Sequence, residues 1–235
     1  MMHGHCIQFA GVNNIGKSTQ IGLLSNWLAA RGVISKTIKF PMYDLGQRGL
    51  FLQKYLKDKA FREDYRKQFE DAEERVARAI IENHHDFEPH LKSLLVGGTW
   101  VIIEGSVVDS IAWSQVNGIS SAEAKQLRTG LTAGDIEILL HENRGRRFLE
   151  AKEVGHVNES DETRIKKARS YMRALAKEEC FLVERVNFFL EESREEVFEK
   201  VLRVIFNKGL LPENVIQNRN RCSVFHTTLS PVDFI

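Results

Sequence analysis

The most informative stretch of the sequence is Gly11-Val12-Asn13-Asn14-Ile15-Gly16-Lys17-Ser18. It matches the phosphate-binding-loop pattern G-x-x-x-x-G-K-[ST] at every fixed position. Glycines let such a loop curl closely, so that its backbone N–H groups can surround a polyphosphate. The lysine adds a positive charge, and the serine hydroxyl is a suitable ligand for Mg²⁺. The stretch therefore predicts a nucleotide-binding site.

The sequence on either side has the order that this motif requires. Residues 6–10 form an apolar run of strand length, and residues 17–31 carry apolar side chains at helical spacing. A strand, a glycine loop and a helix whose N-terminus faces the phosphates make a recognised anion site. We assign the nucleotide contacts to Gly11, Asn13, Asn14, Ile15, Gly16, Lys17, Ser18 and Thr19.

The composition limits the size of the domain, the class of partner and the location of the protein. The chain has 235 residues, enough for one sizeable α/β domain, and 33 Lys and Arg against 32 Asp and Glu give a net charge of +1. This balance argues against a nucleic-acid partner. The three cysteines have neither paired nor metal-like spacing, which favours a reduced, cytoplasmic location. We expect no signal peptide and no membrane span.

Strand-like and helical segments alternate along the chain, which predicts a parallel sheet with crossover helices. We expect strands at residues 6–10, 33–40, 100–103, 136–140 and 180–183. We expect helices at 17–31, 46–57, 61–95, about 143–153 and 192–207, and another that ends at Lys177. Within 61–95 a new or kinked helix could begin near Pro89, and residues 108–131 would form several helical pieces.

These segments predict an α/β fold of the phosphate-loop NTPase type. It has three layers, with a five-stranded parallel sheet flanked by helices, and a short lid near the polar loop 155–161. Residues 1–210 would form one domain, and the polar segment 211–235 a poorly ordered C-terminal tail.

Several segments, together with the glycine loop, resemble the thymidylate kinase family. Residues 9–20 are similar to the opening of those kinases, Phe/Leu-Glu-Gly-x-Asp-x-x-Gly-Lys-Ser/Thr-Thr-Gln. Residues 39–44 resemble their Phe-Pro-x-Tyr segment, and residues 101–115 align without gaps on their Asp-Arg-Tyr and Ser-Gly-Val-Ala-Tyr blocks. Residues 134–140 are similar to their Pro-Asp-Leu-x-Leu-x-Leu strand, and the resemblance extends over residues 5–208.

The chain departs from the family where the acceptor nucleotide is held. The family's Asp in the glycine loop is Asn13, which can donate to or accept from a hydroxyl but carries no charge. The family's Asp-Arg pair after the third strand is Glu104-Gly105, so one cation is missing. The Phe and Arg that hold the base fall near Ala79 and Asn83 by ungapped counting. A shift in register would place them at Phe69 and Arg75 instead.

The lid segment also lacks the arginine that the resemblance implies. It reads Gly-His-Val-Asn-Glu at residues 155–159, and the nearest cations are Lys152 and Arg164. Replacement cations could come from Lys39, Arg48, Arg144, Arg146 and Arg147. Arg146 and Arg147 follow the fourth expected strand, close to the lid. For each of these residues, a solvated helix face is the alternative interpretation.

The resemblance implies an ATP-dependent nucleoside-monophosphate kinase, with dTMP as the first acceptor to test, Mg²⁺ as cofactor and a homodimer as the assembly. The catalytic residues would be Lys17, Glu104, Arg146 and Arg147, and the metal would bind Ser18 and Glu104. The acceptor would contact Asn13, Phe40, Pro41, Tyr43, Asn83 and Trp113.

Several of these residues also have a structural interpretation. Glu104 ends a buried strand at the sheet edge where ligands bind, although it could be a structural cap. Trp113 could stack on a base or belong to the core. His84, His85 and His90 form the main histidine cluster, but adjacent histidines do not share a helical face, so a zinc site is not expected.

Two other functions stay open. The missing cations favour a nucleotide-binding protein that has lost catalysis and works as a regulator or interaction module, although the intact Lys17-Ser18 pair argues against it. Glu104-x-Ser106 is similar to the Glu-Arg-Ser of deoxynucleoside kinases. Those enzymes place a general-base Glu where this chain has Phe40-Pro41, which argues against that family.

Overall fold

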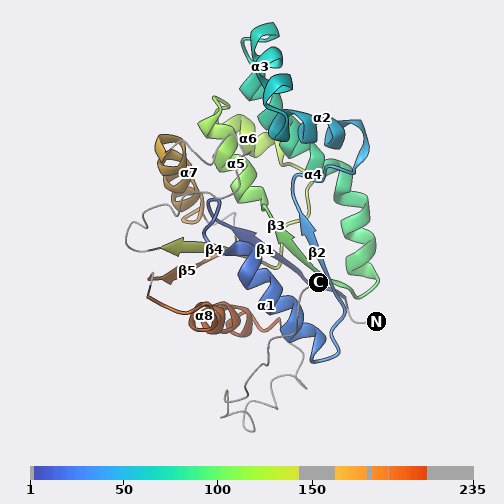
Figure 1. The fold of residues 1–235 in the computed structure, drawn as a ribbon. Helices are drawn as coiled ribbons and strands as arrows, with labels where there is room; N and C mark the ends of the chain where they lie inside the picture. Colours follow the sequence, from blue (N-terminus) through green and yellow to red (C-terminus); the bar gives the residue numbers. More distant parts are fainter. Residues whose placement is uncertain (1–2, 143–161, 179–181, 190, 211–235) are drawn as a thin grey trace, which may run out of the picture.

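The computed structural model describes residues 3–142, 162–178, 182–189 and 191–210 (Figure 1). Its centre is a sheet of five parallel strands in the order β2-β3-β1-β4-β5. The strands are β1 (Cys6–Ala10), β2 (Ser35–Lys39), β3 (Trp100–Glu104), β4 (Ile136–Glu142) and β5 (Val183–Phe188). The predicted five-stranded parallel sheet is therefore confirmed.

Helices cover both faces of this sheet. They are α1 (Lys17–Ala29), α2 (Gly46–Lys57), α3 (Lys59–Gln68), α4 (Ala72–Val96), α5 (Val107–Val116), α6 (Ser121–Leu127), α7 (Glu162–Leu175) and α8 (Arg194–Asn207). Helices α1 and α8 pack together on one face, whereas α4, α5 and α7 cover the other, and α2 and α3 extend beyond the sheet (Figure 1). This confirms the predicted three-layer α/β fold. None of the described helices is long and apolar enough to cross a membrane.

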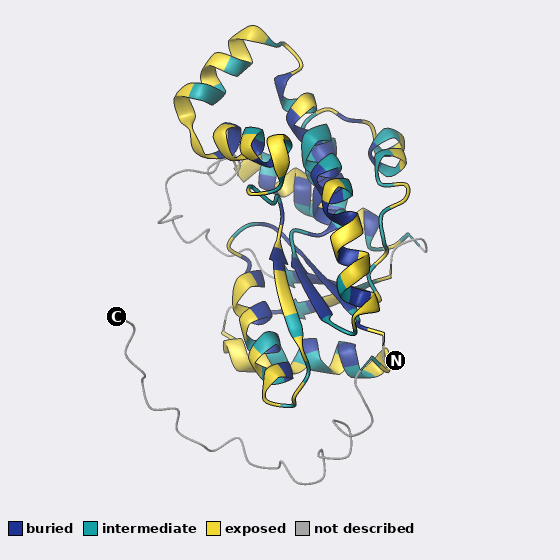
Figure 2. Ribbon diagram, turned by 90° about the vertical axis from the view of Figure 1, so that its right-hand side faces the viewer, coloured by how far each residue is buried: buried dark blue, intermediate teal, exposed yellow. Residues whose placement is uncertain are grey.

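The central strands are buried on both faces because each is covered by two helical layers. In β3, Val101 and Ile103 pack with Phe87 and Leu91 of α4, whereas Ile102 joins the larger cluster that contains α1. Figure 2 shows the same difference across the sheet: the inner strands are buried, while β2 at the edge carries exposed residues. The continuous apolar run of β3 follows from this double coverage.

Two local predictions were wrong. The fifth strand is Val183–Phe188, so it begins where the predicted strand 180–183 ends, and residues 180 and 181 lie outside the described residues. β5 is an edge strand in which only Val186 and Phe188 are buried. Its pattern is therefore weaker than that of the apolar residues just before it. The prediction of a new helix at Pro89 was wrong, since α4 continues through Pro89 to Val96, whereas a kink there stays a prediction. The 61–95 stretch is instead divided between Gln68 and Ala72.

The carboxyl ends of β1, β2 and β3 meet at one edge of the sheet. Glu104, the last residue of β3, is in register with Phe9 of β1 and with Lys39 of β2. Parallel strands bring the segments that follow them to this edge, where open α/β sheets bind ligands. The glycine loop and residues 40–45 are therefore neighbours, although about thirty residues separate them in sequence.

Candidate functional site

The glycine loop has the curled backbone that its sequence predicts. Gly11 and Gly16 have φ values of 143° and 102°, and Asn14 lies at 60°. A Cβ on Gly11 would lie 3.0 Å from Ile15 Cγ2 and 3.1 Å from the Leu140 carbonyl oxygen, so the loop has little room for a side chain there. Gly16 is the N-cap of α1, which places the helix N-terminus beneath the loop.

Lys17 is buried beneath this loop. Its ammonium donates to the carbonyl oxygens of Gly11, at 2.5 Å, and of Val12, at 3.0 Å. Burial lowers the pKa of Lys17, and the carboxylates of Asp109 and Glu104 oppose that shift. The positive charge is therefore held at the base of the loop by two acidic residues.

Asp109 is a site residue that the sequence analysis did not select. It lies in the first turn of α5, and its Oδ1 accepts the Gly11 N–H at 2.8 Å. Burial raises the pKa of Asp109 to about 6, although Lys17 and the N–H groups of Gly11 and Ser106 favour its anion. The sequence held no distinct signal for it, because an acidic residue is common in the first turn of a helix. Asp109 ties the first peptide of the glycine loop to α5.

Ser18 and Glu104 lie together at the front of the loop. The Ser18 hydroxyl donates to Glu104 Oε1 at 2.9 Å, and the Lys39 ammonium lies 3.2 Å from the same oxygen. A hydroxyl and a carboxylate are the hard oxygen ligands that Mg²⁺ prefers, and this ion commonly takes one or two protein ligands beside the phosphates. Ser18 and Glu104, which the sequence predicts as metal ligands, therefore lie close together and carry oxygen atoms that suit Mg²⁺.

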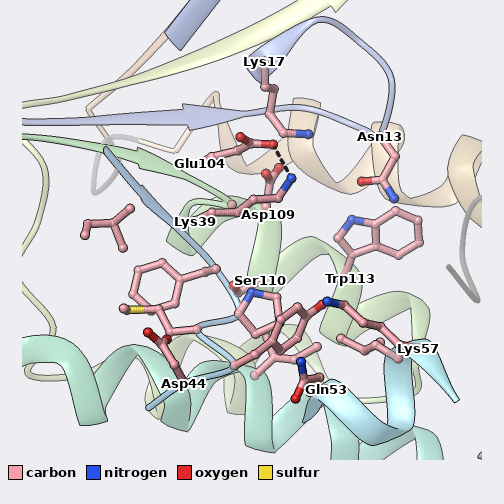
Figure 3. Close-up of a pocket in the computed structure, with 18 of the residues that line it drawn as sticks. Asn13, Lys17, Lys39, Asp44, Gln53, Lys57, Glu104, Asp109, Ser110 and Trp113 are labelled. Carbon is pink, nitrogen blue, oxygen red and sulfur yellow. Dashed lines mark ion pairs between the residues drawn. The ribbon is translucent and has the colours of Figure 1, made fainter. Parts of the chain in front are cut away.

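A large cavity of about 1040 Å³ opens beside these groups (Figure 3). Lys17, Glu104 and Asp109 lie together at one end of it, and Gln53 and Lys57 line it farther from them. The structure brings all but one of the predicted acceptor residues to its wall, namely Asn13, Phe40, Pro41, Tyr43 and Trp113. Trp113 also packs against the main core, and its stacking on a base stays a prediction.

Asn83 is the predicted acceptor residue that does not line this cavity. Its side chain is fully buried, and it accepts the Met42 N–H at 2.7 Å and donates to the Met42 carbonyl at 3.1 Å. Asn83 thus fixes the segment after β2 that forms the cavity wall. The alternative pair, Phe69 and Arg75, is also absent from the wall, and the Arg75 guanidinium lies over the Phe69 ring.

His84 supports the same wall from behind. Its ring stacks on Phe40 with centroids 3.7 Å apart, and its Nε2 lies 2.9 Å from the hydroxyl oxygen of Ser110, which lines the cavity. Burial lowers the pKa of His84 to about 3, so the ring is neutral near pH 7. Within the described residues, no cluster of His, Cys, Asp and Glu has the arrangement of a metal site. The histidine therefore organises Phe40 and Ser110.

The predicted replacement cations have different positions. Lys39 lines the cavity, whereas Arg48 is paired with Glu82 and Asp86 of α4. Arg146 and Arg147, together with the predicted helix 143–153, the lid and the tail 211–235, lie outside the described residues. Two arginines of α7, Arg169 and Arg173, line a small cavity beside Gly11 and were not selected from the sequence.

Comparisons with known proteins agree with this geometry. The chain is 30% identical over 137 residues to a putative thymidylate kinase of Invertebrate iridescent virus 6 and 28% identical over 119 residues to the thymidylate kinase of African swine fever virus. These matches cover 58% and 51% of this chain, and 60% and 45% of the two relatives. The resemblance to the thymidylate kinase family is thus confirmed.

Solved structures of thymidylate kinases share the fold of this chain. A thymidylate kinase structure from Candida albicans superposes with a TM-score of 0.68, at 19% identity, covering 88% of this chain and 93% of its own. One from Ehrlichia chaffeensis gives 0.63, at 17% identity, covering 86% and 99%. No protein-family model matches the chain. Because these structural identities are low, they show a shared fold, whereas the sequence matches carry the relationship to thymidylate kinases.

Proposed function

We propose that the protein transfers the γ-phosphoryl group of ATP to a deoxynucleoside monophosphate, with dTMP as the acceptor. The observation that carries this proposal is the single cavity that runs from Lys17 and Glu104 to the aromatic wall of Phe40, Tyr43 and Trp113. The glycine loop binds the phosphates of the donor through its backbone N–H groups. The wall beyond it offers an apolar and aromatic surface that binds a second nucleotide.

Within this arrangement each described group has a distinct task. Lys17 neutralises charge on the transferred group, and Ser18 with Glu104 would hold Mg²⁺. When bound, Mg²⁺ supplies charge neutralisation and fixes the donor phosphates. Phe40 and Tyr43 exclude water from the acceptor side, and Asn83 and His84 hold their segment in place. Catalysis by such a site rests on positioning and on electrostatic stabilisation.

The proposal is tested by measuring ADP formation from Mg-ATP with a panel of nucleoside and deoxynucleoside monophosphates. A panel is appropriate because the thymidylate kinase of Candida albicans, which shares the fold, is described as having broad substrate specificity. Turnover with dTMP would support the proposal. Turnover with another monophosphate alone would keep the reaction and replace the acceptor. Tight ATP binding without turnover on any acceptor would contradict the proposal and favour a regulatory nucleotide-binding protein.

Asp109 gives a prediction about the donor side. Replacing Asp109 with alanine removes the acceptor of the Gly11 N–H, which is a charge-assisted hydrogen bond. We expect the Kd for Mg-ATP, measured by calorimetry, to rise by about tenfold. Asp109→Asn keeps an oxygen that can accept the same N–H and should have a smaller effect. Equal affinities for Asp109→Ala and the unmodified protein would show that α5 does not help to form the loop.

A further inference from the structure

The backbone explains why residue 105 cannot supply a cation to the cavity. Gly105 has a φ of 84°, and a Cβ placed on it would lie 2.8 Å from the Phe40 carbonyl oxygen. L residues rarely adopt this conformation, and the contact is too close for any side chain. A positive charge next to Glu104 therefore has to come from another part of the chain.

Lys39 is placed to supply that charge. It ends β2, the strand next to β3, and it is in register with Glu104. Figure 3 marks the ion pair between its ammonium and Glu104. The ammonium lies 3.2 Å from Glu104 Oε1, the same oxygen that accepts from Ser18. An ammonium has three donors, and this ion pair engages one side of it. The side chain is 72% exposed, so the remaining donors can reach a ligand in the cavity.

The other cations of the cavity are committed elsewhere or distant. Among the described residues that line it there are four lysines and no arginine. Lys17 is held by the loop carbonyls, and the Lys57 ammonium lies 4.5 Å from the centroid of the Tyr43 ring. Lys36 lies three residues before Lys39, roughly 10 Å back along the strand.

We propose that the Lys39 ammonium binds the phosphate of the acceptor nucleotide, directly between the glycine loop and the Phe40 wall. This rests on the proposed function and names the group that holds the acceptor for transfer. It is specific to this chain's own geometry, because the cation comes from β2 and Gly105 cannot carry a side chain beside Glu104. Phosphoryl transfer brings two anionic phosphates together, and a cation between them lowers their repulsion.

The test compares dTMP with thymidine, which differ by the phosphate alone. The Kd of each is measured by calorimetry for the unmodified protein, Lys39→Ala and Lys39→Arg. We expect dTMP to bind more tightly than thymidine, and Lys39→Ala to reduce that advantage by about tenfold with little change for thymidine. Lys39→Arg should restore most of the advantage, because it keeps the positive charge.

Lys92→Ala is the matched control. The Lys92 ammonium also lies 3.2 Å from a largely buried carboxylate, that of Glu88, and its side chain is 61% exposed, but it does not line the cavity. It should leave the advantage of dTMP unchanged. An undiminished advantage in Lys39→Ala would overturn the assignment of Lys39 and leave the acceptor site standing. Failure of the unmodified protein to bind any nucleoside monophosphate would overturn the proposed function as well.

Discussion

Replacing Lys17 with alanine is expected to lower the rate of phosphoryl transfer by at least about 10²-fold, the effect of removing one group that stabilises developing charge. Lys17 is the buried cation of the glycine loop, and two carboxylates hold it there. Alanine keeps the first turn of α1, because it is the strongest helix former. The measurement is kcat in an assay of ADP formation with Mg-ATP and the acceptor that the panel identifies.

Lys17→Met is the companion variant, because it keeps the apolar stem but not the charge. If the charge is what matters, both variants lose activity alike, and a methionine variant that kept its rate would contradict the catalytic role. A second readout is the pKa of Asp109, followed by NMR of its carboxyl carbon. Lys17 favours the anion of Asp109, so the pKa should rise above its value of about 6 when the charge is removed.

The sequence was sufficient for most of the fold and for the glycine loop. The loop from Gly11 to Ser18 lies within consecutive residues, so its motif alone predicts the strand before it, its curled backbone and the helix that follows. The central strands carry long apolar runs because they are covered on both faces. The edge strand β5 has no such run, which is why its position was predicted several residues too early.

The acceptor side was less predictable because its residues meet only through the tertiary fold. Lys39 and Glu104 are 65 residues apart in sequence and become neighbours through strand register. Asn83 has the residue type of a base-reading group, yet its amide binds the backbone of Met42. Asp109 resembles any acidic residue in the first turn of a helix, and only its bond to Gly11 reveals its position. Residue type alone does not distinguish a side chain that supports a wall from one that faces the ligand.

The buried carboxyl group of Glu137 makes the strongest prediction about stability. Glu137 lies on β4 behind α5, where it accepts the Val108 N–H at 3.2 Å and contacts the side chain of Ser106. Burial raises its pKa to about 8 from an ordinary value of 4.5. Between these two values the folded protein keeps a proton that the unfolded chain releases. The stability from this group is therefore fully present at low pH and is lost as the pH rises toward 8.

Glu137→Gln should remove this dependence, because an amide has the shape of the protonated acid and cannot ionise. Its oxygen can still accept the Val108 N–H. The free energy of unfolding of the variant, relative to the unmodified protein, should rise by about 1.4 kcal/mol per pH unit between pH 5 and 7.5. This difference is measured by urea unfolding at several pH values, with circular dichroism as the signal. Glu184→Gln, which changes a half-exposed carboxylate of the same sheet, is the control. If the free energies of unfolding of Glu137→Gln and the unmodified protein changed with pH in parallel, Glu137 would be ionised in the folded protein. The N-terminus of α5, which carries Asp109, would then stabilise the anion.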